Sequence, residues 1–274
     1  MKFADLHTHT LFSDGTYTPE ALVEKAGKAG LSCISVADHD TAAGIGRAMA
    51  AAEGAGIELI PGIEMTAEYC GREVHMLGYF IDSRNKALNE NLTLLRERRV
   101  ERIYKMLEKL KGMGIKLKAE AIFDLAVYGT IGRLHVARAL VSQGFVSSTS
   151  EAFNRIIGDD CPAYVLGFKL LPQEAVKLIR GAGGIPVLAH PFTLRDDSLI
   201  GGLIKCGVMG LEVYYPEHTC AQRDKYIKIA QQNNLLLTGG SDFHGDAKPK
   251  SELGSCKIPY DLVEKLKTAR GSNL

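Results

Sequence analysis

Two histidines near the start of the chain have the spacing of a metal-binding pair. His7 and His9 lie two residues apart in a run that has the pattern of a strand. Alternate residues of a strand point to one face, so both imidazoles face the same side. Asp14 follows in a Ser-Asp-Gly turn that can fold back toward them. Since His-x-His also occurs on ordinary edge strands, the rest of the chain must support a metal site.

Similar side chains recur at the ends of the other predicted strands. The set comprises His7, His9, Asp38, His39, Glu64, His75, His190, Glu212, Asp242 and His244. Six of the eight histidines belong to it, which scattered core positions would not produce. A parallel barrel gathers its strand ends at one mouth, where active sites form. Ligation by imidazole and carboxylate suits Mn²⁺, Fe²⁺ or Zn²⁺, and the number of ligands implies two or three ions, with Glu64 able to bridge two of them.

Short apolar runs alternate with amphipathic helical patterns, which favours a parallel sheet or barrel of the α/β class. After the first strand, further strands are expected at residues 33–37, 58–65, 73–79, 185–191, 208–214 and 235–244. Among the helices, Thr18-Pro19 has the sequence of a helix start, with Thr as N-cap and Pro at the first helical position. Other helices are expected to begin at Pro172, Cys220 and Tyr260.

Between residues 86 and 166 the alternation gives way to mostly helical patterns. We interpret this stretch as a helical cap inserted into a barrel formed by residues 1–85 and 167–274. Residues 96–118, on and after one long helix, carry nine Lys/Arg and three acids, a local balance of 9 − 3 = +6. Because such runs usually form solvated helix faces, we expect an exposed face here. The alternative is a positive lid that attracts an anionic substrate.

The bulk composition excludes other classes of protein. A formal net charge of +1 over 274 residues gives no overall attraction to nucleic acid or membrane surfaces. The six cysteines are widely spaced without a Cys-x-x-Cys motif, so we expect reduced thiols in a cytoplasmic protein. No secretory signal pattern and no apolar run of the ~20 residues that a membrane span needs is present. No motif indicates a stable protein partner.

Several of these motifs together resemble those of the PHP (polymerase and histidinol phosphatase) phosphoesterases. The matching segments are Asp5-Leu6-His7-Thr8-His9, Ser13-Asp14-Gly15, Ala37-Asp38-His39-Asp40-Thr41, Gly62-Ile63-Glu64, the His75 strand, Ala189-His190-Pro191 and Gly240-Ser241-Asp242-Phe243-His244. The resemblance implies a distorted (β/α)7 TIM-like barrel with a site for three metal ions. It implies one ion at His7, His9, Glu64 and Asp242, a second at Glu64, His75 and His190, and a third at Asp14, His39 and His244.

The predicted cap carries Gly132-Arg133-Leu134-His135, which is similar to the cap motif of stand-alone family members that dephosphorylate nucleotides. Those members often have proline where this chain has Leu134. Arg133 could bind phosphate bidentately, and His135 could hydrogen-bond the phosphate or protonate the leaving oxygen. An arginine at a helix start and a packing histidine are the alternatives. His218 is a weaker candidate for substrate contact, with a surface histidine as its alternative.

We therefore expect a phosphoric ester hydrolase in which a metal-activated hydroxide attacks a phosphate monoester. The expected substrate is AMP, a 3′,5′-bisphosphate nucleotide or the end of a short RNA. A histidinol-phosphate phosphatase of the same family is one alternative. A catalytically silent PHP interaction module is another, but none of the expected ligands is missing. A hydrolase of C–N bonds on a similar barrel fits the Asp242–His244 motif less well.

Overall fold

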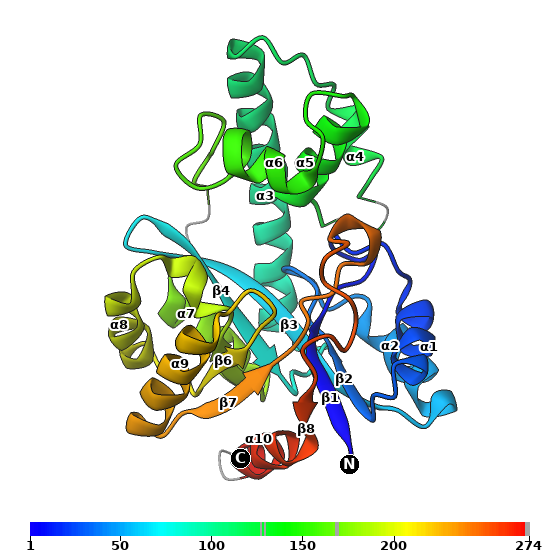
Figure 1. Ribbon diagram of the computed structural model, residues 1–274, viewed down its shortest axis with the longest axis vertical. Coiled ribbons are helices and arrows are strands. Elements are labelled where there is room, and N and C mark those ends of the chain that lie inside the picture. Colours follow the sequence, from blue (N-terminus) through cyan, green and yellow to red (C-terminus); the bar gives the residue numbers. More distant parts are fainter. Residues whose placement is uncertain (127, 129, 168–169, 272–274) are drawn as a thin grey trace.

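A computed structural model describes residues 1–126, 128, 130–167 and 170–271. The expected cap and barrel ranges also include the few residues outside this description. Strands lie side by side in the order β7-β6-β5-β4-β3-β2-β1-β8, forming a nearly closed barrel with helices around it (Figure 1). Their bounds are β1 Phe3–Thr8, β2 Cys33–Val36, β3 Glu58–Tyr69, β4 Arg72–Tyr79, β5 Ile185–Leu188, β6 Gly210–Tyr214, β7 Leu236–Gly239 and β8 Ile258–Pro259. A bridge between Thr8 and Phe243 brings the two ends of the sheet together. The expected TIM-like fold is confirmed.

Two parts of the barrel depart from the expected parallel arrangement, since β8 also runs antiparallel to β1. β4 runs antiparallel to both β3 and β5. The loop between β3 and β4 is only Cys70-Gly71, and both residues have positive φ, 51° and 73°. Two such residues make a tight hairpin turn, whereas a parallel connection needs a crossover of a dozen or more residues. His75 therefore lies beside Thr66 in the first half of β4, not at the downstream end of its strand.

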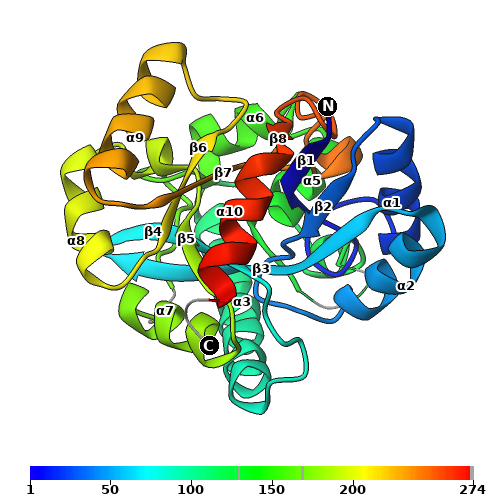
Figure 2. The same ribbon diagram turned by 90° about the horizontal axis from the view of Figure 1, so that it is seen from below.

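The helices α1, α7, α9 and α10 begin where their sequence signals predict. α1 (Pro19–Lys28) starts after Thr18, whose side chain accepts a hydrogen bond from the amide of Ala21. The other helices are α2 Ile45–Ala55, α7 Pro172–Gly181, α8 Ile200–Lys205, α9 Cys220–Gln232 and α10 Tyr260–Gly271, with 3₁₀ turns η2 Pro191–Leu194, η3 Asp197–Leu199 and η4 Gly245–Ala247. Figure 2 shows α10 lying across the end of the barrel opposite the cap.

The inserted segment forms a helical layer at the other end of the barrel (Figure 1). It contains α3 Lys86–Gly112, α4 Glu120–Phe123, α5 Arg133–Ser142, α6 Thr149–Ala152 and the π-helical turn η1 Phe153–Ile157. Its helices share a core of their own, to which Ile103, Met106 and Leu140 belong. The division into a barrel and a cap of residues 86–166 stays a prediction, which this separate core supports.

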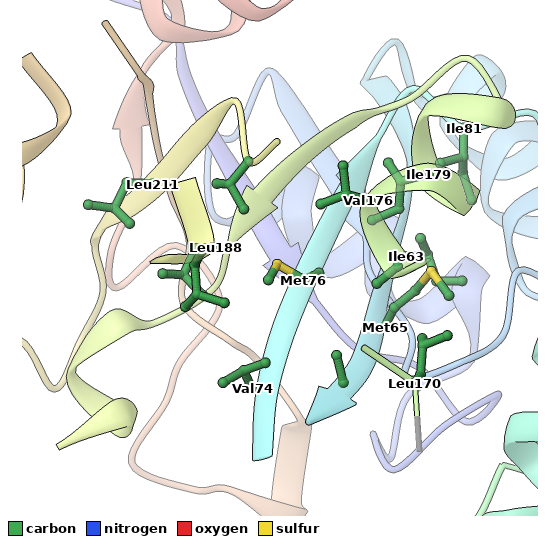
Figure 3. Close-up of a cluster of buried hydrophobic side chains, with 14 of the residues drawn as sticks. Ile63, Met65, Val74, Met76, Ile81, Leu170, Val176, Ile179, Leu188 and Leu211 are labelled. Carbon is green, nitrogen blue, oxygen red and sulfur yellow. The ribbon is translucent and has the colours of Figure 1, made fainter. Parts of the chain in front are cut away.

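Apolar packing on β3 and β4 determines which of their side chains reach the interior of the barrel. Ile63 and Met65 of β3 and Met76 of β4 pack in one buried cluster with Ile179 of α7 (Figure 3). Because side chains alternate along a strand, Glu64 is directed to the opposite face from Ile63 and Met65. The same alternation separates His75 from Met76. Burial of the outer face thus fixes the register that brings metal-ligating side chains together.

All six cysteines lie within the described residues and form no disulfide there. Among the described residues, no helix has both the length and the apolar character needed to cross a membrane.

Candidate metal centre

The carboxylate of Glu64 lies at the centre of a cluster of imidazoles at the mouth of the barrel. Its Oε2 atom lies 3.1 Å from His7 Nε2, 3.3 Å from His9 Nε2 and 3.2 Å from His39 Nδ1. Its Oε1 atom lies 2.8 Å from His75 Nδ1 and 2.9 Å from His190 Nε2. Glu64 is only 1% exposed, so this carboxylate is surrounded by potential ligands rather than by solvent.

Ligand atoms gather in three overlapping groups, each with atoms within 4.8 Å of one another. The groups are His7, His9, Glu64 and Asp242; His9, Asp14, His39 and His244; and His39, Glu64 and His75. The first has the composition that the family resemblance implies, and the second adds His9 to the expected three. His190 is outside these groups but contacts Glu64. The structure therefore brings all nine predicted ligands together, while their metal ligation stays a prediction.

Several atoms of this cluster fit metal ligation better than hydrogen bonding. His9 Nε2, Asp14 Oδ1 and His39 Nδ1 are buried, and none has a hydrogen-bond partner among the described residues. His9 Nε2 is nevertheless 3.1 Å from Asp242 Oδ1. Buried polar atoms are normally hydrogen-bonded, and exceptions occur at functional sites. These atoms lie close together but do not have the geometry of hydrogen bonds. A divalent cation bound between them would need this arrangement of ligand atoms.

The protonation states in the cluster follow from burial and mutual attraction. Burial alone would raise the pKa of Glu64, but His39, His7 and His75 hold this pKa well below its usual range. Burial would lower the pKa of His75, but Glu64 raises it to about 10. Attraction to the nearby carboxylates of Asp242 and Glu64 likewise outweighs burial and raises the pKa of His9 to about 9. These histidines therefore bind protons that a metal ion would displace.

Burial and the charges of neighbouring residues act on the other ligands as well. The pKa of Asp14 falls well below its usual range because His244 and His39 outweigh the opposing effect of burial. The pKa of Asp242 falls in the same way, with Lys248 as the largest opposing charge. Both aspartates are thus ionised, the form in which carboxylates bind cations.

Carboxylates behind the cluster hold its ligands in place. Glu212 accepts a hydrogen bond from His7 Nδ1 at 2.9 Å, which leaves His7 Nε2 directed at Glu64. Asp5 accepts hydrogen bonds from the amides of Ser241 and Gly254, both at 2.8 Å, and so fixes the segment before Asp242.

Asp38 has a different partner from the one its position suggests. Asp38 directly precedes His39 in the chain, but its carboxylate accepts hydrogen bonds from Thr10 and from Ser13 Oγ, at 2.6 Å in the latter case. Asp38 thereby braces the turn that carries Asp14. His39, the next residue, instead contacts Glu64, with His39 Nδ1 3.2 Å from Glu64 Oε2.

The three substrate candidates occupy different environments. Arg133 lines the cavity above the cluster, and its guanidinium pairs with Asp159 at 2.7 Å and with Glu73 at 2.9 Å. His135 is 1% exposed and does not line that cavity; its Nδ1 accepts a hydrogen bond from the Gly132 amide. Burial lowers the pKa of His135 to about 4, so the ring is neutral and carries its proton on Nε2.

His218 is also absent from the cavity lining. Its ring instead packs edge-on against Phe192, with centroids 5.3 Å apart, and lies 5.3 Å from Tyr215. Both of these aromatic residues do line the cavity. Direct substrate contact by His218 and His135 stays a prediction that this geometry does not support.

Three charged residues that line the cavity were not singled out in the sequence. They are Glu73, Glu217 and Lys248. Glu73 lies 3.0 Å from His75 Nε2 and 2.8 Å from Arg102 Nη1, and it also pairs with Arg133. Lys248 Nζ lies 2.7 Å from Asp242 Oδ2.

The expectation of an exposed charged face on the long helix is wrong for Arg99 and Arg102. They are 6% and 4% exposed, and Arg99 Nε donates to buried Asp40 at 2.7 Å. The sequence does contain a pattern that predicts the burial of these two arginines. The buried face of α3 follows helical spacing through Leu88, Leu92, Leu95, Arg99, Arg102, Ile103, Met106 and Leu110. The two arginines occupy positions of this inward stripe, whereas the other basic residues of the run lie off it.

The cluster forms the floor of a cavity of about 480 Å³ that lies between barrel and cap. Its barrel side presents the ligand groups, and its cap side presents Arg99, Arg102 and Arg133. Arginine binds phosphate oxygens in a bidentate manner, and a cluster of metal ligands opposite it can face the same phosphate. The site therefore combines the two elements that phosphoryl chemistry needs.

Comparisons with known proteins agree with this geometry. A family model described as PHP domain matches residues 5–122. The chain is 32% identical to a phosphoribosyl 1,2-cyclic phosphate 1,2-diphosphodiesterase of Eggerthella lenta, covering 88% of this chain and 94% of that protein. It is 35% identical to a 5′-3′ exoribonuclease of Haemophilus influenzae, covering 88% and 89%. A 3′,5′-nucleoside bisphosphate phosphatase of Chromobacterium violaceum is 32% identical, covering 91% and 90%.

A solved structure described as a metal-dependent phosphoesterase from Bifidobacterium adolescentis superposes with a TM-score of 0.89. It shares 36% sequence identity, and the match covers 97% of this chain and 96% of that one. The fold and its cluster of ligands define a metal-dependent phosphoric ester hydrolase. The chain belongs to the PHP family, as its motifs predict.

Proposed function

We propose that this phosphoesterase hydrolyses phosphate monoesters of nucleotides, either free nucleotides or the ends of short RNA. The observation that carries the proposal is that one cavity is lined by residues of the three ligand groups on its barrel side and by three arginines on its cap side. The relatives from Haemophilus influenzae and Chromobacterium violaceum, whose names specify an exoribonuclease and a nucleoside bisphosphate phosphatase, support a nucleotide substrate.

The nine clustered residues would hold two or three divalent ions; imidazole and carboxylate ligands suit Mn²⁺, Fe²⁺ or Zn²⁺, and Mn²⁺ is the metal we expect first. Bound divalent ions supply an activated water and neutralise charge on the phosphoryl group. Glu64 reaches two of the ligand groups and is the residue suited to bridge ions.

The arginines of the cap would orient the substrate. Arg133 is the least buried of the three, with 16% of its side chain exposed, and Asp159 is its partially exposed partner. A phosphate oxygen can replace Asp159, because an arginine presents several donors in one plane. Glu73 keeps its bond to the same guanidinium and so preserves the orientation of Arg133.

The direct test is release of inorganic phosphate by metal-stripped protein reconstituted with Mn²⁺. The substrates are AMP, adenosine 3′,5′-bisphosphate, a short 5′-phosphorylated RNA and histidinol phosphate. We expect turnover of at least one nucleotide substrate and a loss of at least about 100-fold in Asp242→Asn, which removes a clustered carboxylate charge. Asp261→Asn is the matched control, since Asp261 lies exposed on α10. Turnover of histidinol phosphate alone, or of none of the four esters, contradicts the proposal.

A further inference from the structure

The cavity above the metal centre continues into a second cavity. The two have volumes of about 480 and 350 Å³, and both are lined by Phe153, Phe192 and Arg133, so they form one passage. The second cavity leads from His190 toward Arg195, whose side chain is 58% exposed. A substrate with its phosphate at the metal centre thus has a passage beside it for the rest of the molecule.

Two aromatic rings line this passage from different parts of the fold. Phe192 belongs to η2, which follows β5 and His190 in the barrel. Phe153 opens η1, the π-helical turn of the cap. Both side chains are partly exposed, so their rings have surface available to a ligand. Single π-helical turns are rare and often occur at functional sites.

Packing holds both rings in place. The Phe192 ring contacts Tyr215, with centroids 5.5 Å apart, and His218 packs edge-on against it. The His218 ring is itself fixed by the carbonyl of Val213, 3.0 Å from Nδ1. On the cap side, the Arg133 guanidinium lies 5.7 Å from the centre of the Phe153 ring. Preorganised aromatic rings lose little conformational entropy when a flat ligand binds.

We propose that Phe153 and Phe192 form a base-binding slot, in which the nucleobase of the substrate stacks while its phosphate lies over the metal centre. This inference rests on the nucleotide function proposed above. Aromatic side chains stack on any nucleobase, because every base has a π face. Asn154, Thr193 and Arg195 line the same passage and offer hydrogen-bond donors and acceptors to a base edge.

The slot predicts a preference for nucleotides over matched esters without a base. The matched pairs are AMP with ribose 5-phosphate, and adenosine 3′,5′-bisphosphate with ribose 3,5-bisphosphate. In Phe192→Leu and Phe153→Leu, we expect the ratio of kcat/KM for nucleotide to kcat/KM for base-less ester to fall about tenfold. Phe192→Tyr keeps the ring and should keep most of the preference. Phe145→Leu is the control, since Phe145 is 40% exposed and lines neither cavity.

A binding measurement complements the kinetics. The fluorescence of a 2-aminopurine nucleotide is quenched by stacking, and metal-stripped protein can bind the probe without turnover. We expect quenching by the native protein and by Phe145→Leu, and weaker quenching by Phe192→Leu. Equal quenching and an unchanged preference ratio in the slot variants would overturn the slot while leaving the nucleotide function intact. A native protein that hydrolyses no nucleotide would overturn the proposed function and the slot together.

Discussion

Replacing Glu73 by glutamine tests how the cap is connected to the metal centre. The Glu73 carboxylate, with 7% of its side chain exposed, contacts His75 of the barrel and Arg102 and Arg133 of the cap at 2.8–3.0 Å. Burial would raise the pKa of Glu73, but Arg102 and Arg133 hold it well below its usual range, so the carboxylate is charged. Glutamine keeps the shape of the side chain and one acceptor oxygen but removes the charge.

The expected cost follows from these contacts. Removing one partner of a buried ion pair destabilises a protein by about 3–5 kcal/mol, because the remaining charge stays buried. In Glu73→Gln, Arg102 and Arg133 each lose the ion pair with Glu73, and Arg133 retains its pair with Asp159. We therefore expect a loss of about 3–5 kcal/mol in the free energy of unfolding. Since Glu73 also orients the ring of His75, Mn²⁺ affinity should fall by about 10–100-fold.

Two assays measure these effects separately. Urea unfolding of the metal-stripped proteins gives the change in folding free energy, and calorimetric titration with Mn²⁺ gives the change in affinity. Glu53→Gln is the matched control, because Glu53 is exposed on α2. Unfolding free energies and Mn²⁺ affinities equal to those of the unmodified protein would refute the view that Glu73 joins cap and metal centre.

Three further predictions concern the support of the site and the metals. Glu212→Gln removes the charged acceptor of His7 Nδ1, so calorimetry should show Mn²⁺ affinity lower by about 10–100-fold. Arg99→Met leaves the carboxylate of Asp40 buried without its ion pair, and urea unfolding should show a loss of about 3–5 kcal/mol. Removing the metal with a chelator should lower the free energy of unfolding by about 2.7 kcal/mol per site, compared with protein in Mn²⁺ at 100 times its Kd. An unchanged melting temperature would argue against metal binding by the folded state.

Local signals predicted much of the fold and the ligand cluster. Thr18-Pro19 marked the start of α1, because capping and proline geometry act within one turn of helix. The spacing of His7 and His9 predicted a shared direction, since side-chain alternation is a property of the strand itself. Both histidines do converge on Glu64, although β1 ends at Thr8.

Long-range features were harder to predict. The alternation around His75 indicates which side chains share a face but not whether the strand runs parallel to its neighbour, so the β3–β4 hairpin was missed. The charge of Arg99 and Arg102 suggested an exposed helix face, although their helical spacing placed them on the buried stripe. The pairing of Lys248 with Asp242 depends on the path of the loop after β7, which the sequence pattern does not specify.

The metal content of purified protein tests the central claim most directly. Elemental analysis after reconstitution with Mn²⁺ and removal of free metal should give two or three ions per chain. Anomalous diffraction should place them among the groups that share Glu64 and His9. Glu64→Ala should lose at least one ion. A protein that binds no ion at these residues and still releases phosphate from nucleotides in the presence of chelator would contradict the account.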